Sequence, residues 1–101
     1  MKILPLVSII IPCRNEEKYI AQCIESIIAN DYPKQSFEIL VVDGMSQDNT
    51  REIVEKYTKA NPFIRMIDNH KKLKPTAFNL GIQNAKGEVI ILIGAHAFVE
   101  K

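Results

Sequence analysis

The fold is decided by the stretch Val7-Ser8-Ile9-Ile10-Ile11-Pro12-Cys13-Arg14-Asn15-Glu16-Glu17. Its first half is a nearly unbroken run of β-branched residues, which predicts a strand buried on both faces, because a half-exposed strand alternates apolar with polar residues. We expect Pro12 to end the strand, since proline has no N–H to donate to a sheet ladder. Asn15 is expected to cap a helix whose positive end suits Glu16 and Glu17. A strand that leads directly into a helix is half of a βαβ unit, so a site is predicted between Pro12 and Glu16.

Helices and strands alternate along the rest of the chain. The first helix carries apolar residues at the helical period, namely Tyr19, Ile20, Cys23, Ile24, Ile27 and Ile28. Three further strands are expected over 37–42, 64–67 and 89–93, the last apolar on both faces. A second helix, capped by Asp48 or Ser46, should end at Asn61, and a third should begin at Pro75 and stop at Gly87. The inner face of this third helix is predicted to carry Ala77, Phe78, Ile82 and Ala85.

The order of these elements, β-α-β-α-β-α-β, predicts the fold class. Short connections between alternating strands and helices favour a Rossmann-like α/β fold with three αβα layers, a parallel sheet and right-handed crossovers. In the strand order 3-2-1-4, the first and fourth strands are neighbours at the switch point, where a crevice opens. Polar segments follow the strands, at 14–16, 43–46, 68–74 and 94–96. We therefore expect these segments to meet at one edge of the sheet.

Composition and charge narrow the class of protein. The 101 residues make one domain or part of one, and a hydrophobic content of 47% suffices for a packed core. A net charge of +1 gives no basic field for nucleic acid, since residues 70–74 form the one local cluster of lysines. The apolar start lacks a signal-peptide cleavage site and falls short of the roughly 20 residues of a membrane helix. We expect a soluble, cytoplasmic segment with no membrane span.

Several familiar motifs are excluded. Cys13 and Cys23 lack metal-ligand spacing, so we expect free thiols in a reducing compartment, and neither is expected to be a nucleophile. The four glycines fit neither GxGxxG nor GxxxxGK(S/T), the two common phosphate-binding motifs. Asp43 ends a buried strand, as the phosphoryl acceptor of a receiver fold does. Such a fold also needs acidic Mg²⁺ ligands after its first strand, and this sequence has none there.

Three ordered segments resemble family 2 glycosyltransferases of the GT-A fold. They are the opening stretch, EILVVDGMSQDNT over 38–50, and AFNLGI over 77–82 followed by AKGE over 85–88. The resemblance implies that 1–101 is the nucleotide-binding N-terminal half of a GT-A domain, with the acceptor half absent from this sequence. It implies an inverting enzyme that moves a sugar from a nucleoside diphosphate donor, with UDP the expected nucleotide. The acceptor would be a saccharide or a lipid-linked molecule in cell-surface polysaccharide synthesis.

The resemblance also implies a set of donor-binding residues, which are Pro12, Cys13, Arg14, Glu16, Asp43, Lys74 and Ala95. Asp43 matches an acid that accepts a hydrogen bond from the base, and a cap or turn acid is the alternative. Lys72 or Lys74 would reach the diphosphate, unless their loop is merely solvated. The catalytic base is expected outside this chain, so no residue here is assigned that role.

The last motif departs from the family pattern. Family members carry Asp-x-Asp after the fourth strand, where the final acid binds Mn²⁺ or Mg²⁺, and this sequence has Gly94-Ala95-His96. His96 is the candidate metal ligand, because a neutral imidazole can ligate Mn²⁺, although Mg²⁺ prefers carboxylate and water. The alternative is a histidine hydrogen-bonded near the strand end. We expect Mn²⁺ or Mg²⁺ as the cofactor, at a site weakened by the loss of one acid.

Two other functions stay open at this point. A non-catalytic nucleotide-sugar-binding module would explain Gly94, and a folded domain without any ligand would not be stabilised by a nucleotide. An uncovered sheet edge would also favour self-association. A part of the protein beyond this sequence could hold it at the inner face of the membrane.

Overall fold

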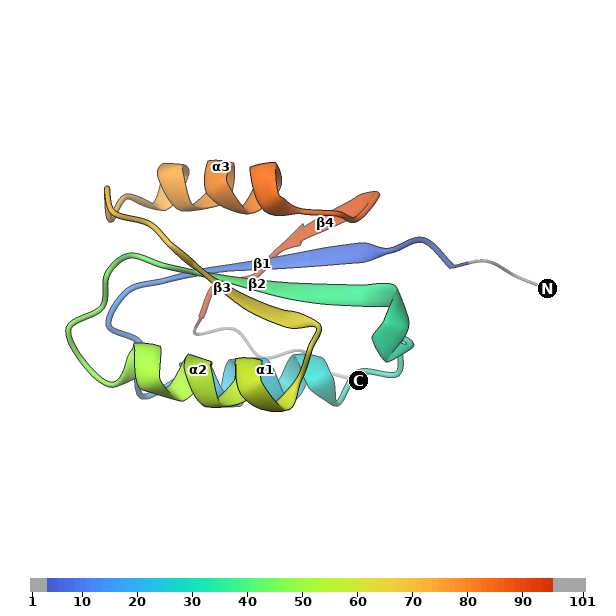
Figure 1. The fold of residues 1–101 in the computed structure, drawn as a ribbon, viewed down its shortest axis with the longest axis horizontal. Coiled ribbons are helices and arrows are strands. Elements are labelled where there is room, and N and C mark those ends of the chain that lie inside the picture. The colour runs from blue at the N-terminus through green and yellow to red at the C-terminus, as the bar shows by residue number, and fades with distance from the viewer. Residues whose placement is uncertain (1–3, 96–101) are drawn as a thin grey trace.

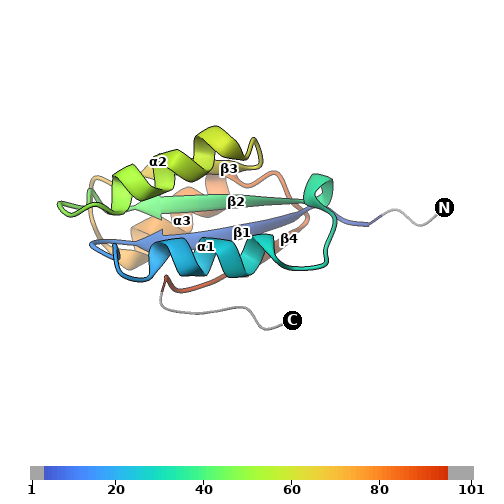
Figure 2. The same cartoon turned by 90° about the horizontal axis from the view of Figure 1, so that it is seen from below.

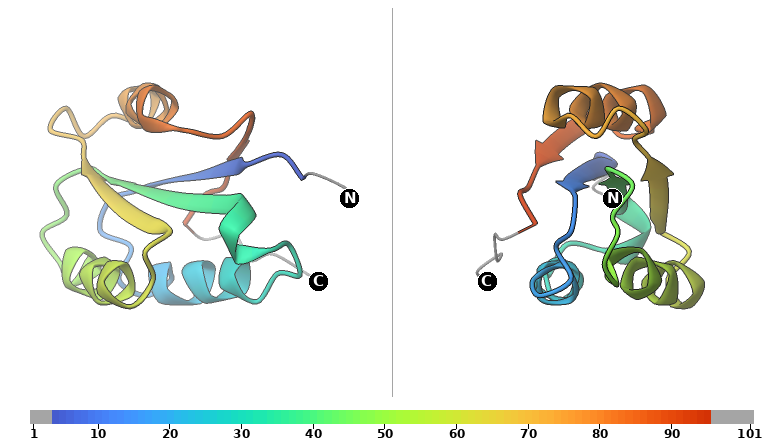
Figure 3. Two further views of the ribbon diagram at one scale, coloured as in Figure 1. Left: turned by 45° about the vertical axis from the view of Figure 1, so that its right-hand side comes forward. Right: turned by 90° about the vertical axis from the view of Figure 1, so that its left-hand side faces the viewer.

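The computed structural model describes residues 4–95. It has one four-stranded parallel sheet in the predicted order β3-β2-β1-β4 (Figure 1). The elements are β1 (Val7–Cys13), α1 (Ile20–Ile28), the 3-10 turn η1 (Lys34–Ser36), β2 (Phe37–Asp43), α2 (Thr50–Ala60), β3 (Ile64–Asp68), α3 (Lys74–Asn84) and β4 (Val89–Leu92). Helices α1 and α2 lie side by side on one face of the sheet, and α3 covers the other (Figures 2 and 3). The predicted three-layer αβα class is confirmed.

The core lies on both faces of the central strands β1 and β2, which are buried along their whole length. On one face, Ile9, Ile11 and Val41 belong to the cluster that packs against α1 and α2. On the other face, Ile10 and Leu40 pack against α3. Successive side chains of a strand point to opposite faces, so each central strand supplies both clusters. The unbroken apolar runs in the sequence have this physical cause.

Strand β1 does not end at Pro12, as the sequence analysis expected, but continues to Cys13, with Pro12 paired opposite Val42. The Ile10 carbonyl accepts a hydrogen bond from the Ile93 N–H, which shows that the backbone N–H and C=O groups of Ile10 point toward β4. The backbone nitrogen of Pro12, two residues later, points to the same side, but there it lies beyond the end of β4 at Leu92. Its missing N–H therefore removes no bond from the ladder, and the strand continues.

The fourth strand is shorter and more exposed than predicted. It ends at Leu92, and its four apolar side chains are between 40% and 49% exposed. Beyond β1, no further strand pairs with β4 among residues 4–95. The predicted self-association through an uncovered edge stays a prediction. Within the same residues, every helix is too short or too polar to cross a membrane.

Helix α3 begins one residue before Pro75 and ends at Asn84, so Gly87 lies beyond its end. The prediction that Ile82 faces the core is wrong, since its side chain is 49% exposed. Ala77 and Gly81 are the buried positions of the helix. A Cβ on Gly81 would lie 2.5 Å from the Ile10 Cγ2 atom. Glycine therefore lets α3 approach the sheet closely, and this contact turns Ile82 outward.

Candidate functional site

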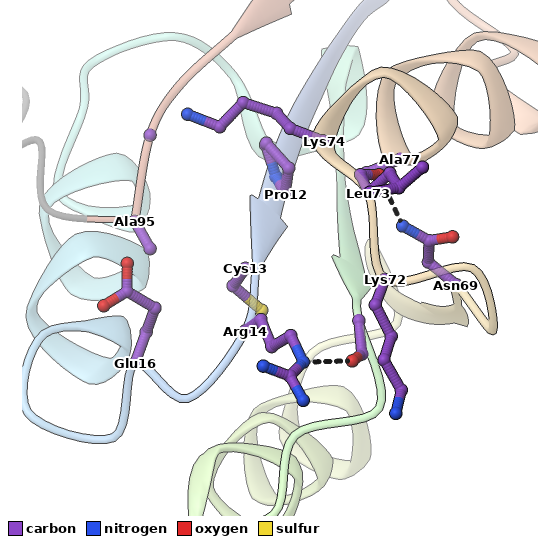
Figure 4. A pocket seen from close by; sticks show the side chains of 12 residues that line it. Pro12, Cys13, Arg14, Glu16, Asn69, Lys72, Leu73, Lys74, Ala77 and Ala95 are labelled. Atoms are coloured by element: carbon purple, nitrogen blue, oxygen red, sulfur yellow. Dashed lines mark hydrogen bonds between the residues drawn. The ribbon is translucent and has the colours of Figure 1, made fainter.

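A pocket of about 280 Å³ opens at the carboxyl end of β1, between the end of β4 and the start of α3. This is the switch point of the strand order, where the sequence analysis expected a crevice. Six of the seven residues predicted to bind a donor line it, namely Pro12, Cys13, Arg14, Glu16, Lys74 and Ala95 (Figure 4). Gly44, Asn69, Lys72, Leu73, Ala77 and Gly94 complete the lining.

The loops after β1 and β2 are tied together beside this pocket. The Asn15 N–H donates to the Ser46 hydroxyl at 2.8 Å, and the Asn15 Oδ1 atom accepts from the Gln47 N–H at 2.8 Å. The Glu16 N–H donates to the Thr50 hydroxyl at 2.8 Å. The prediction that Asn15 caps a helix is wrong, because α1 begins at Ile20. Asn15 has a φ of 54°, and its side chain joins two loops that are far apart in the sequence.

Asp48 and Ser46 were the two predicted caps of α2, but the N-cap residue is Asn49, and its side chain makes no capping hydrogen bond. The Asp48 Oδ1 atom accepts from the N–H of Thr50, the first residue of α2, at 2.9 Å. Ser46 instead donates its hydroxyl to Asp43. Hydrogen bonds from Thr50 and Glu17 outweigh desolvation and lower the pKa of Asp48. One acid therefore holds both the start of α2 and the loop after β1.

Asp43 is completely buried and does not line the pocket. Its Oδ1 atom accepts the Ser46 hydroxyl at 2.5 Å and the Cys13 thiol at 3.5 Å. Its Oδ2 atom accepts the Ser46 N–H at 2.9 Å and the Arg51 Nη1 at 2.8 Å. A base could reach this carboxylate only after one of these donors moves away. The alternative role, as an acid that organises a turn, is the one these contacts describe.

Arg51 is a residue that the sequence analysis missed. It bonds Asp43 through Nη1 and Asp68 through Nη2, at 2.8 and 2.7 Å, and so joins the carboxyl ends of β2 and β3 to α2. Its hydrogen bonds to Asp68 and Asp43 raise the pKa of its guanidinium. Its position in the first turn of a helix gives no sign of this role, because the pairing depends on the parallel register of two strands.

Both cysteines are free and buried. Burial raises the pKa of the Cys13 thiol, and the Asp43 carboxylate raises it further. Burial also raises the pKa of Cys23 to about 11. Both groups are therefore neutral thiols near pH 7, in agreement with the prediction that neither is a nucleophile.

Asn69 is a second residue that the sequence analysis missed. It is 1% exposed and lines the pocket. Its Nδ2 atom donates to the Leu73 carbonyl at 2.9 Å, and its backbone N–H donates to the Asp43 carbonyl at 2.7 Å. These two bonds shape the loop between β3 and α3. A single buried asparagine within a polar loop carries no periodic signal, so only the fold reveals it.

Three cationic side chains and one carboxylate belong to the pocket. Lys74 extends across its opening from the start of α3 (Figure 4), whereas Arg14 and Lys72 both lie close to Gly44. The Arg14 Nε atom donates to the Gly44 carbonyl at 3.1 Å. The Glu16 carboxylate lies on the opposite wall, beside Ala95 (Figure 4). The pocket is therefore suited to an anion.

A divalent cation fits this set of side chains poorly, because Mn²⁺ and Mg²⁺ prefer several oxygen or imidazole ligands. Among residues 4–95, no three His, Cys, Asp or Glu side chains gather closely enough to hold a metal ion. His96, the predicted metal ligand, lies outside the described residues. The predicted metal site thus gains no support from the part of the pocket that the structure describes.

A parallel α/β sheet with a pocket at its switch point defines a class of proteins that bind nucleotides and related ligands. The particular family follows from comparison with known proteins. The model of glycosyl transferase family 2 matches residues 8–101, and the chain belongs to this family.

One curated relative is a dolichyl N-acetyl-alpha-D-glucosaminyl phosphate 3-beta-D-2,3-diacetamido-2,3-dideoxy-beta-D-glucuronosyltransferase of Methanococcus voltae. It is 45% identical over 97 residues, which cover 94% of this chain and 30% of the relative. The chain therefore spans less than a third of the length of this relative.

Two solved structures share the fold. The mannosyltransferase PcManGT of Pyrobaculum calidifontis, in complex with GDP-Man and Mn²⁺, has a TM-score of 0.89 and 28% identity. The match covers 96% of this chain and 29% of that one. TarS of S. aureus in complex with UDP-GlcNAc has a TM-score of 0.80 and 33% identity, over 90% of this chain and 26% of TarS. The predicted GT-A fold is thereby confirmed.

Proposed function

We propose that this chain is the donor-binding part of a glycosyltransferase that uses a nucleoside diphosphate sugar, with UDP as the nucleotide. One observation carries the proposal. The pocket at the switch point is lined by six of the residues that match the family's donor-binding positions, including Lys74 at the start of α3, together with Lys72 in the loop before this helix. Neighbours of the same fold, solved with UDP-GlcNAc and with GDP-Man, support the ligand class.

The reaction we propose is transfer of the sugar to a saccharide or lipid-linked acceptor with inversion. In such a transfer, negative charge grows on the leaving diphosphate, and nearby cations stabilise it. We assign this role to Arg14, Lys72 and Lys74, which line the pocket, and the base would lie against Pro12 and Cys13. No residue of this chain is assigned as the base, and no step of the proposal depends on a metal ion. The cytoplasmic location stays a prediction.

The test is thermal unfolding of the chain with UDP, GDP, CDP and ADP. A ligand at 100 times its dissociation constant adds about 2.7 kcal/mol to the stability of a protein, which shifts the melting temperature of a domain this size by several degrees. We expect UDP to give the largest shift. If no nucleotide raises the melting temperature, the proposed function is wrong and the chain has the fold without a ligand.

A non-catalytic nucleotide-sugar-binding module is the second candidate, and Gly94 favours it. The family pattern has an acid at this position, and a Cβ built on Gly94 would meet nothing within 4 Å. An aspartate therefore fits there without strain. In a longer form of the protein that includes the acceptor half, we expect UDP release from UDP-GlcNAc to rise in Gly94→Asp if the site is catalytic. Equal, undetectable release from both forms would favour the module.

A further inference from the structure

The charges of the pocket disagree with a metal-bridged diphosphate. Family members use a carboxylate motif to hold a divalent cation, and the solved neighbour PcManGT contains Mn²⁺. In this chain, the described lining has one carboxylate, Glu16, and three cations. Gly94 stands where the first acid of that motif is expected. The described lining therefore carries mainly positive side chains, whereas a metal site would be lined by carboxylates.

Lys74 lies on one side of the pocket, apart from the other two cations (Figure 4). It is the first residue of α3, and its side chain reaches over the pocket toward the strand that leads to Ala95 (Figure 4). Arg14 and Lys72 lie on another side of the pocket (Figure 4), both close to Gly44. A diphosphate lying between these sides would have cations on both of its flanks. Arginine and lysine are the usual phosphate-binding side chains.

The start of α3 also favours the binding of an anion. The first N–H groups of a helix have no partner within the helix, and the dipole makes this end positive. In α3, no side chain caps the N-terminus and no acid occurs in the first turn. Lys74 adds a positive charge to this positive end, which weakens the helix in isolation. A bound anion would remove that repulsion, so the unfavourable placement of Lys74 has a physical reason if the pocket holds a diphosphate.

We propose that Lys74, together with Lys72 and Arg14, neutralises the donor diphosphate in place of a divalent cation, so that this chain binds UDP without metal. The proposal rests on the proposed function, because it concerns the same pocket. It adds that the affinity for the diphosphate comes from Arg14 after β1, from Lys72 in the β3–α3 loop and from Lys74 at the start of α3. The role assigned to Lys74 is that of a binding residue that touches the phosphates.

The experiment is calorimetric titration with UDP, UMP and uridine, each in chelator and in Mn²⁺. Lys74→Ala is the test variant, and Lys71→Ala is the matched control, because Lys71 is exposed in the same loop and does not line the pocket. We expect wild-type UDP affinity in chelator and in Mn²⁺ to agree within about threefold. Lys74→Ala should weaken UDP about tenfold or more and leave uridine unchanged, because a charge-assisted contact to phosphate is lost. Lys71→Ala should bind all three ligands as the wild type does.

Unfolding without ligand separates a binding role from a structural one. Lys74→Ala should melt at the same or a slightly higher temperature than the wild type, since it removes a cation from the positive end of α3. A lower melting temperature together with loss of uridine binding would show that Lys74 only supports the fold, and would overturn the proposal.

Further outcomes distinguish the proposal from the function on which it rests. UDP binding that requires Mn²⁺ and is lost in His96→Ala would overturn metal-free binding and leave the proposed function intact. No binding of any nucleotide in either condition would overturn both. Gly94→Asp supplies the reverse test. It should weaken UDP in chelator through repulsion of the phosphates and recover affinity in Mn²⁺, whereas an unchanged affinity in chelator would contradict the charge argument.

Discussion

The two ends of β2 each bury a carboxylate beside a serine and an arginine, but their surroundings differ. At the amino end, Glu38 accepts the Ser8 hydroxyl at 2.6 Å and the Lys86 N–H at 2.7 Å, and it pairs with Arg65 at 3.2 Å. The Ser8 hydroxyl in turn accepts the Gly87 N–H at 2.8 Å. These hydrogen bonds hold the connection between α3 and β4 against the start of β1 and β2.

At the carboxyl end, Asp43 makes the corresponding contacts with Ser46 and Arg51, and the loops around it form the pocket. All three described non-glycine residues with a positive φ belong to these loops, namely Asn15, Met45 and Lys72. Strained backbone of this kind is found mostly where a site requires it. A buried acid paired with an arginine thus occurs at both ends of β2, and at both ends it joins separate segments of the fold. The pocket and its cations, and not the acid alone, identify the carboxyl end as the site.

The largest expected effect comes from Asp43→Ala. Asp43 is fully buried, and its carboxylate accepts hydrogen bonds from Ser46, Arg51 and Cys13. Loss of all these bonds at once should lower the free energy of unfolding by about 3 kcal/mol, although Arg51 keeps its contact with Asp68. Urea unfolding measures it. The control is Asp68→Ala, which removes the other partner of Arg51. Its side chain is 43% exposed, so this substitution should cost less than about 1 kcal/mol. Equal losses would contradict the assignment of Asp43 as the junction of the loops.

The next largest effect on stability is expected from alanine substitutions of the glycines near the two ends of β2. A Cβ on Gly87 would lie 2.6 Å from the Ser8 Oγ atom and 2.7 Å from the Leu6 carbonyl oxygen. Gly87→Ala should therefore destabilise the fold by about 2 kcal/mol. A Cβ on Gly44 would meet Arg14 at 3.3 Å and Lys72 at 3.4 Å, so Gly44→Ala should cost less than about 1 kcal/mol. Thermal unfolding of both variants tests this order, and the reverse order would contradict it.

A smaller effect is expected from the pH dependence of Glu38. Burial alone would raise the pKa of this carboxyl, but hydrogen bonds from Lys86, Ser8 and Arg65 outweigh it, and the pKa lies below the ordinary value of 4.5. A lowered native pKa stabilises the fold above that ordinary value, and the stabilisation is lost as the pH falls below it. Glu38→Gln should lower stability at pH 7 by about 1 kcal/mol and flatten the pH dependence below the ordinary pKa of a glutamate. An unchanged acid profile would show that another carboxyl dominates it.

The smallest effect is expected at Met45, whose φ is 58°. Non-glycine residues disfavour this region, so Met45→Gly should stabilise the fold by about 0.5 kcal/mol after the entropy cost of glycine is subtracted. Chemical unfolding of the variant measures the change. Gln47→Gly, in the same loop, serves as the control and should be neutral or destabilising. A destabilised Met45→Gly would mean that the side chain of Met45 contributes more than its backbone costs.

The sequence predicts most of the fold because the core strands are so strongly apolar. The run from Val7 to Ile11 and the run from Phe37 to Val42 have no other good interpretation, and alternating helices fix their order. Strand β4 has the same composition but is 40% to 49% exposed. Composition shows that a strand prefers burial, but it does not show whether a neighbour covers it.

The site is predicted less completely. Six pocket residues follow from their positions after strands, because parallel strands bring their carboxyl ends to one edge. The partners of Asp43 do not follow, since Arg51 and Ser46 reach it through loop conformations that no periodicity encodes. The conformation of Asn15 could not be predicted from the sequence either. Asparagine suits both a helix cap and a left-handed turn, and only the tertiary contact with Gln47 decides between them.

The most direct test of the account is titration of the ¹⁵N-labelled chain with UDP, followed through its backbone amide signals. The two ends of β2 serve as site and internal reference in one experiment. The account predicts shifts at Gly44, Lys72 and Ala95, which line the pocket, and none at Glu38 or Gly87. Shifts concentrated at the amino end, or no shifts at a UDP concentration that saturates related enzymes, would contradict it.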